Sequence, residues 1–177
     1  GNVGSRLAVK AQLLDWNVIG YDPYVQLAGI ENVSFQELLK QADAISIHVP
    51  LTLAGDYPTQ HLFSDATFAA MKASAILINS ARGPVIQQSA LMEDIKKNNR
   101  KVVLDVFEFE PEIPAQLLDL LALATPHIAG YSLEGKARGT QMIYEAFCDK
   151  FSYEASKRFE SQLPQVEQYF GQQDLKA

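Results

Sequence analysis

The chain has 177 residues, 47% of them hydrophobic, and a formal net charge of -6. This length supports one ordinary domain with a sizeable core, and the acidic balance argues against non-specific binding to nucleic acid or to an anionic membrane. The single cysteine, Cys148, excludes an intrachain disulfide and fits a cytoplasmic location, and no apolar run approaches the roughly 18 residues of a membrane span.

Helix-like and strand-like segments alternate along the first half of the chain. In chain order we expect a helix at 3–15, a strand at 17–22, a helix at 34–42, a strand at 43–50, a loop at 51–63 and a helix at 64–72. Ser34 followed three residues later by Glu37 is a candidate capping box at the start of the second helix.

The second half continues the alternation. The expected elements are a strand at 73–80, a helix at 87–99, a strand at 101–107, a helix at 114–123, a short strand or loop at 124–130, and a long helix from about Ser132 into the 160s. The runs AILIN and VVLDV are almost continuously apolar, as in strands covered on both faces. Strands separated by helices predict an α/β fold, a Rossmann-like doubly wound parallel sheet.

The opening GNVG matches the second half of the phosphate-binding turn G-x-G-x-x-G, with Asn2 and Val3 beside the phosphates. Asp22 lies 18 residues after Gly4 and closes the predicted strand 17–22. A carboxylate there would accept both adenosine ribose hydroxyls and repel a 2′-phosphate, which favours NAD over NADP. The alternative is that Asp22 is only a turn residue before Pro23.

A strand should precede this turn, and in the sheet order 3-2-1-4-5-6 that strand is central. Without it, backbone groups on both sides of a gap would lack partners. We therefore expect the chain to be part of a longer protein. We expect a cofactor domain at 1–131, followed at 132–177 by a return crossover helix and the start of a C-terminal dimerisation region.

Three stretches with chemically active residues follow the later strands: INSARGPV, LDVFEFEP and ATPHIAGYSLEGKARGT. Ligands bind beyond the carboxyl ends of strands in such sheets, so Arg82, Asp105 or Glu110, and His127 are expected to converge on one crevice. Taken singly, the arginine could be a surface ion-pair partner, the glutamate a solvated turn and the histidine a loop residue.

Together, and in this order after a GxxG…Asp opening, SARG, DVFEFEP and TPHIAG resemble the NAD-dependent D-2-hydroxyacid dehydrogenases over roughly residues 1–150. The resemblance implies that His127 is the acid/base, that Glu110 orients its imidazole, and that Arg82 grips the substrate carboxylate. It also implies that Asp105 contacts the nicotinamide side of the cofactor.

Further contacts are implied by the same resemblance. The cofactor-binding set also includes Gly130, where the backbone would approach the cofactor, and Val49, Ser80 and Ala81. Tyr131 would touch the substrate together with Arg82, and no metal is expected. His48 and His61 are interpreted as structural, although His48 could lie near the cofactor.

The run GYSLEGKARG is similar to one branch of the family, which oxidises 4-phospho-D-erythronate to 2-oxo-3-hydroxy-4-phosphobutanoate on the route to pyridoxal phosphate. The expected partners are therefore a phosphorylated hydroxy acid and a second copy of the full-length chain, with no nucleic acid or membrane. The alternatives are a phosphoglycerate, glycerate or lactate dehydrogenase, and a non-catalytic NAD-sensing protein of the corepressor kind. The 177 residues alone are expected to be inactive.

Overall fold

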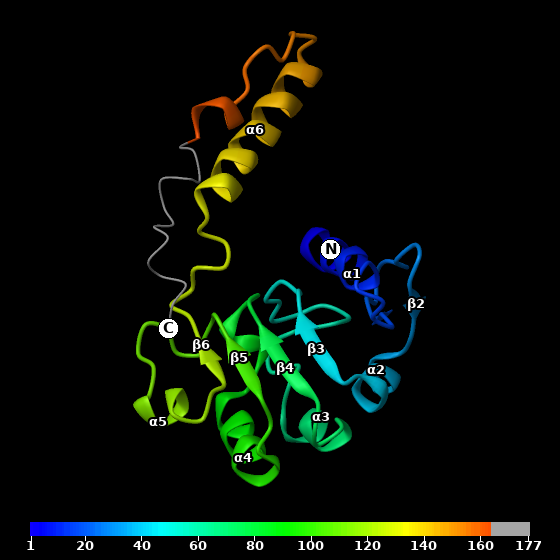
Figure 1. The fold of residues 1–177 in the computed structure, drawn as a ribbon, viewed down its shortest axis with the longest axis vertical. Coiled ribbons are helices and arrows are strands. Elements are labelled where there is room, and N and C mark those ends of the chain that lie inside the picture. Colours follow the sequence, from blue (N-terminus) through cyan, green and yellow to red (C-terminus); the bar gives the residue numbers. More distant parts are fainter. Residues whose placement is uncertain (164–177) are drawn as a thin grey trace. The chain divides into compact units, whose positions relative to one another are not determined.

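A computed structural model describes residues 1–163 of the chain. These residues divide into a compact unit at Gly1–His127 and a second unit that begins at Ile128. Figure 1 shows the sheet and most of the helices in the first unit and one long helix, α6, in the second. Each unit is described by itself below.

The first unit holds both sheets. Its helices are α1 (Asn2–Gln12), α2 (Phe35–Gln41), α3 (Asp65–Ala70), α4 (Gln88–Asn98) and α5 (Ala115–Leu118), with a 3₁₀ turn η1 at Gly83–Val85. Its strands are β1 (Ile19–Gly20), β2 (Glu31–Asn32), β3 (Ala44–Ile47), β4 (Ile76–Asn79), β5 (Val102–Leu104) and β6 (Leu123–Ala124). The second unit contains α6 (Leu133–Lys150) and the 3₁₀ turn η2 (Glu160–Gln162).

All the strands are parallel to their neighbours. Strands β3, β4, β5 and β6 form a four-stranded sheet in chain order, and β1 pairs separately with β2 (Figure 1). In the four-stranded sheet Ala44 faces Ile76, Leu77 faces Val102 and Val103 faces Leu123. No ladder within residues 1–163 joins β1 to β3. The predicted α/β class with a parallel sheet is confirmed, and the two ladders have the pairing expected on either side of a central strand in the order 3-2-1-4-5-6.

The core lies between the sheet and the helices on it. Its largest fully buried side chains include Leu39, Leu77, Leu91, Val102 and Leu117, from α2, β4, α4, β5 and α5. Both Leu77 and Val102 belong to the apolar runs from which a covered sheet was predicted. Burial of such side chains contributes about 1.5–3 kcal/mol each to folding.

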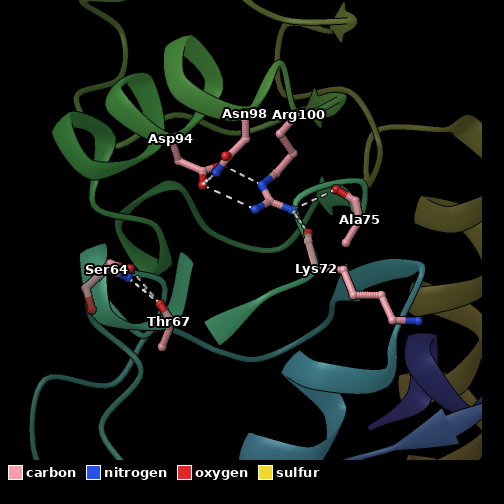
Figure 2. Close-up of polar contacts among 7 residues, drawn as sticks. All are labelled: Ser64, Thr67, Lys72, Ala75, Asp94, Asn98 and Arg100. Atoms are coloured by element: carbon pink, nitrogen blue, oxygen red, sulfur yellow. Dashed lines mark hydrogen bonds and ion pairs between the residues drawn. The ribbon is translucent and has the colours of Figure 1, made fainter. Parts of the chain in front are cut away.

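Local sequence signals account for how several helices begin. Glu37 Oε2 accepts hydrogen bonds from the Ser34 hydroxyl at 2.7 Å and the Ser34 N–H at 2.9 Å, and Ser34 Oγ accepts from the Glu37 N–H at 3.2 Å. This is the predicted capping box, and its hydrogen bonds lower the pKa of Glu37. At α3, the Thr67 hydroxyl oxygen accepts from the Ser64 N–H at 2.6 Å (Figure 2).

A buried ion pair ties α4 to the amino end of β4. Arg100, which is 2% exposed, donates from Nε to Asp94 Oδ2 at 2.5 Å and from Nη1 to the carbonyls of Lys72 and Ala75 (Figure 2). Asn98 donates to the other Asp94 oxygen at 2.8 Å. The pair lies at the edge of the sheet where the strands begin, so its role is structural.

Three expectations about the elements differ from the structure. The helix predicted at 114–123 is limited to α5, because Leu123 pairs with Val103 and belongs to β6. Strand β2 was not predicted, because its two residues are both exposed and show no apolar pattern. Helix α6 begins near Ser132 as predicted but ends at Lys150, because Phe151 leaves the helical conformation and Ser152 adopts a left-handed φ of 56°. The tail expected to lead to a dimerisation region lies partly outside the described residues. No helix within residues 1–163 is long and apolar enough to cross a membrane.

Candidate active site

The carboxyl ends of β3 to β6 meet at one edge of the sheet because these strands are parallel. Four turns follow these ends, and they carry most of the predicted site. The turns contain His48 and Val49 after β3, Ser80 to Arg82 after β4, Asp105 to Glu110 after β5, and Thr125 to His127 after β6.

Glu110 and His127, 17 positions apart, form a hydrogen-bonded pair. Glu110 Oε2 lies 2.7 Å from His127 Nδ1, and Glu110 Oε1 accepts from the Phe107 N–H at 2.6 Å. The two side chains are 31% and 47% exposed, so the pair is open to a ligand. Because the carboxylate accepts the Nδ1 proton, Nε2 is the imidazole nitrogen that can take a proton from a substrate.

The backbone of His127 is held in an unusual conformation. Its φ of 54° lies in the left-handed region, and its N–H donates to the Asp105 carbonyl at 2.9 Å. The Asp105 side chain is 5% exposed and accepts from the Thr125 hydroxyl at 2.6 Å. Strain of this kind persists only where the surroundings enforce it, and it is concentrated at functional sites.

Arg82 lies at the neighbouring turn after β4, and its exposed guanidinium donates from Nη1 to the Ala81 carbonyl at 2.6 Å. Asn79, 1% exposed, shapes this turn from the end of β4. Its side chain accepts from the Ala81 N–H and donates to the Arg82 carbonyl, both at 3.0 Å. Sequence reasoning missed Asn79, although a polar residue that ends an apolar strand is a signal for such a role.

The turns after β4 and β5 touch through their main chains. A Cβ added to Gly83 would lie 1.8 Å from the Phe107 carbonyl oxygen, so only glycine fits there. Arg82 is the residue before Gly83, and Glu110 lies three residues after Phe107. The structure thus pairs Glu110 with His127 and puts Arg82 on the adjoining turn, where its side chain donates to the Ala81 carbonyl.

The predicted nucleotide-binding residues lie at the start of α1 and the end of β1. Gly1 is the N-cap of α1, and the Gly1 nitrogen lies 3.7 Å from Asp22 Oδ2. The other Asp22 oxygen accepts from the Tyr24 N–H at 3.0 Å. An 11-residue helix that begins beside a carboxylate fits the phosphates and ribose of NAD. Asn2 and Val3 are exposed in its first turn.

His48 lies beside this turn. Its ring is 3.4 Å from the position that a Cβ on Gly4 would take, and its Nε2 is 2.9 Å from the Ser46 hydroxyl. Burial lowers the pKa of His48. Val49, which follows, is partly buried and packs against the core.

Gly130 and Tyr131 belong to the second unit. A Cβ on Gly130 would meet nothing within 4 Å. The Tyr131 ring is 68% exposed, and the Lys136 ammonium lies 3.9 Å from its centroid. Within residues 1–163, no group of three or more His, Cys, Asp or Glu side chains could hold a metal ion.

Residues 1–129 match the family described as "D-isomer specific 2-hydroxyacid dehydrogenase, NAD binding domain". The chain belongs to this family. The matched residues include all four turns at the carboxyl edge of the sheet as well as the start of α1.

Individual relatives agree with this assignment. The chain is 69% identical over all 177 residues to erythronate-4-phosphate dehydrogenase of Acinetobacter baumannii (strain ACICU), of which it covers 50%. It therefore spans about half the length of such a relative.

Among solved structures, D-mandelate dehydrogenase of Rhodotorula graminis is 32% identical, with a TM-score of 0.70 over 80% of this chain and 44% of that one. D-lactate dehydrogenase of Aquifex aeolicus, in complex with NAD and lactic acid, is 29% identical, with a TM-score of 0.68 over 85% of this chain and 51% of that one.

Proposed function

We propose that these residues are the cofactor-binding part of an NAD-dependent dehydrogenase that oxidises 4-phospho-D-erythronate to 2-oxo-3-hydroxy-4-phosphobutanoate in pyridoxal phosphate synthesis. The observation that carries the chemistry is the Glu110–His127 hydrogen bond at the carboxyl edge of the sheet, beside the Arg82 turn. The choice of substrate is supported by 69% identity to the erythronate-4-phosphate dehydrogenase of Acinetobacter baumannii.

Oxidation of a 2-hydroxy acid requires loss of the hydroxyl proton and of a hydride from the same carbon. When bound, NAD accepts the hydride. In the proposed reaction His127 Nε2 takes the hydroxyl proton, and the imidazole becomes positively charged. Glu110 holds the ring through Nδ1 and stabilises that charge, since its own position is fixed by the Phe107 N–H.

In the proposed reaction Arg82 binds the substrate carboxylate. Its exposed guanidinium can exchange the hydrogen bond to the Ala81 carbonyl for a bidentate pair with the acid, a stronger interaction. Such a pair orients the substrate so that its hydroxyl faces His127, and it polarises the carbonyl that forms at C2.

The residues at the start of α1 and at Asp22 support NAD rather than NADP as the cofactor. The Asp22 carboxylate beside the start of α1 would accept ribose hydroxyls and would repel a 2′-phosphate. Asn2, Val3, Val49, Ser80, Ala81, Asp105 and Gly130 complete the proposed cofactor contacts, and Tyr131 the substrate contacts. We further propose a cytoplasmic homodimer whose N-terminal substrate domain closes over the site and excludes water.

The experiment uses the full-length gene product that contains these residues. It is titrated with 4-phosphoerythronate and NAD while NADH absorbance is followed, next to 3-phosphoglycerate, glycerate and lactate as competing substrates and NADP as the competing cofactor. The proposal expects turnover of 4-phosphoerythronate with NAD above all other combinations. Preference for another hydroxy acid would overturn the substrate, and NAD binding without any turnover would favour a cofactor-sensing protein.

A His127→Ala variant tests the chemistry itself. Turnover should be abolished, whereas the dissociation constant for NAD should be unchanged, because His127 is placed against the substrate. Persistence of turnover in this variant would show that another group is the base.

A further inference from the structure

A second histidine–carboxylate pair lies at the same edge of the sheet. His61 Nε2 is 2.5 Å from Glu108 Oε1, and the two side chains are 39% and 11% exposed. Like His127, His61 has a left-handed backbone, with a φ of 52°. Both histidines that pair with a carboxylate of the turn after β5 therefore have a left-handed backbone.

The carboxylate of this pair also fixes the start of α4. Glu108 Oε2 accepts from the Gln88 N–H at 2.6 Å, at the first residue of the helix. A negative charge at that point is favourable because the helix dipole and an otherwise unpaired N–H both face it. Glu108 thus has both oxygens engaged, one by α4 and one by His61.

The histidine in turn is joined to the segment that follows Arg82. The His61 N–H donates to the Pro84 carbonyl at 2.8 Å, and the Phe63 N–H donates to the Val85 carbonyl at 3.0 Å. Pro84 follows Gly83, whose Cα faces the Phe107 carbonyl. Three contacts therefore form a closed set. The loop at 50–63 bonds the Arg82 turn through its main chain, and the Arg82 turn packs against the turn after β5 at Gly83. The turn after β5 is joined back to the loop by the Glu108–His61 pair.

From this closed set of contacts we infer that His61 and Glu108 are positioning residues, which hold the Arg82 turn against the turn that carries Glu110. The inference rests on the proposed function, because it assigns the pair to the placement of the substrate carboxylate relative to His127. Neither side chain needs to touch the substrate. Loss of the pair lets two turns on adjacent strands move independently, and misplacement by about 1 Å can cost a hundredfold in rate.

The test compares His61→Ala and Glu108→Ala with Glu108→Gln in the full-length protein. The glutamine retains an oxygen for the Gln88 N–H and an amide N–H₂ that can donate to His61. We expect the alanine variants to lose about tenfold or more in kcat/KM, as is usual for partners of active-site groups, and the glutamine variant to retain most of it. The dissociation constant for NAD should change less than twofold in all three, and Lys96→Ala, in an exposed pair with Glu93, should change nothing.

Coupling to Arg82 separates positioning from general destabilisation. In an Arg82→Lys background the His61→Ala effect on kcat/KM should shrink to below about threefold, because residues that act as one unit are not additive. Full additivity of the two losses, or an unchanged kcat/KM in His61→Ala, would overturn the inference.

Amide hydrogen exchange supplies a readout that does not need turnover. In His61→Ala the Phe107 N–H, which Glu110 holds, should exchange at least about tenfold faster, while the Leu77 N–H in β4 keeps its rate. Equal acceleration at both positions would mean global destabilisation and would count against positioning. Absence of wild-type activity on every hydroxy acid would remove the proposed function, and the exchange rates alone would then decide whether the pair holds the turns.

Discussion

Glu110 uses its two carboxylate oxygens for two different tasks: one holds the His127 imidazole at 2.7 Å, and the other accepts the Phe107 N–H at 2.6 Å. The orientation of the histidine is thereby connected to the main chain at the end of β5. A side chain that bonded only the imidazole would leave the ring less well placed.

Replacement of Glu110 by glutamine tests this double role. The amide can still accept from the Phe107 N–H, but it carries no charge to stabilise an imidazolium. We expect kcat of the full-length enzyme to fall by about 10²-fold, within the range of acid–base effects, with little change in NAD affinity. Steady-state kinetics measure this, and a loss below threefold would contradict the role given to Glu110.

The contact between Gly83 and the Phe107 carbonyl leads to a stability prediction. Alanine at position 83 would put a Cβ 1.8 Å from that oxygen, so the two turns must separate. We expect a loss of about 3 kcal/mol in unfolding free energy together with reduced activity. Gly139→Ala in α6 is the control, since its Cβ would meet nothing within 4 Å. Urea unfolding that ranks Gly83→Ala equal to this control would disprove the steric argument.

The Arg100–Asp94 pair should contribute to stability and not to turnover. Arg100→Met leaves the Asp94 carboxylate buried without its cationic partner, which costs about 3–5 kcal/mol. Addition of Asp94→Leu should restore much of this loss, because no buried charge then lacks its counter-ion. Chemical denaturation of both variants measures the effect, and the kcat of folded Arg100→Met should match that of the wild type.

His48 should make stability depend on pH. Its pKa is lowered in the folded protein, chiefly by burial, so the unfolded chain binds more protons at pH values between the lowered pKa and about 6.5. The free energy of unfolding should therefore be fully retained above about pH 6.5 and fall as the pH drops below it. His48→Gln should remove this part of the slope between pH 7.5 and 5.5. A His48 titration at or above its ordinary pKa would refute the prediction.

Features that depend on local pattern were predictable from the sequence. The capping box of Ser34 and Glu37, the strand around Leu77 and the helix 87–99 all follow from short-range periodicity and side-chain chemistry. The placement of Arg82, Glu110 and His127 after successive strands also followed, because parallel strands bring their carboxyl ends to one edge.

Features that depend on contacts distant in sequence were not predictable in the same way. In the sequence Asn79 is only the end of a strand, and its hydrogen bond to the Arg82 carbonyl cannot be predicted. The residues around Gly83 likewise give no sign of its contact with the Phe107 carbonyl. His61 was interpreted as structural, and its partner Glu108 is 47 positions away, with no local pattern that relates the two residues. Such pairs form where two turns distant in sequence come into contact, and no periodicity in the sequence predicts that contact.

The left-handed backbone of His127 restricts what can replace it. Glycine, asparagine and aspartate tolerate that conformation, whereas valine and isoleucine are penalised by their branched Cβ. In a saturation library at this position, yield of folded protein and loss of catalysis would follow separate rules, the first governed by main-chain torsion and the second by proton transfer. Inactive yet well-folded proteins for crystallographic trapping of substrate are therefore best sought with asparagine.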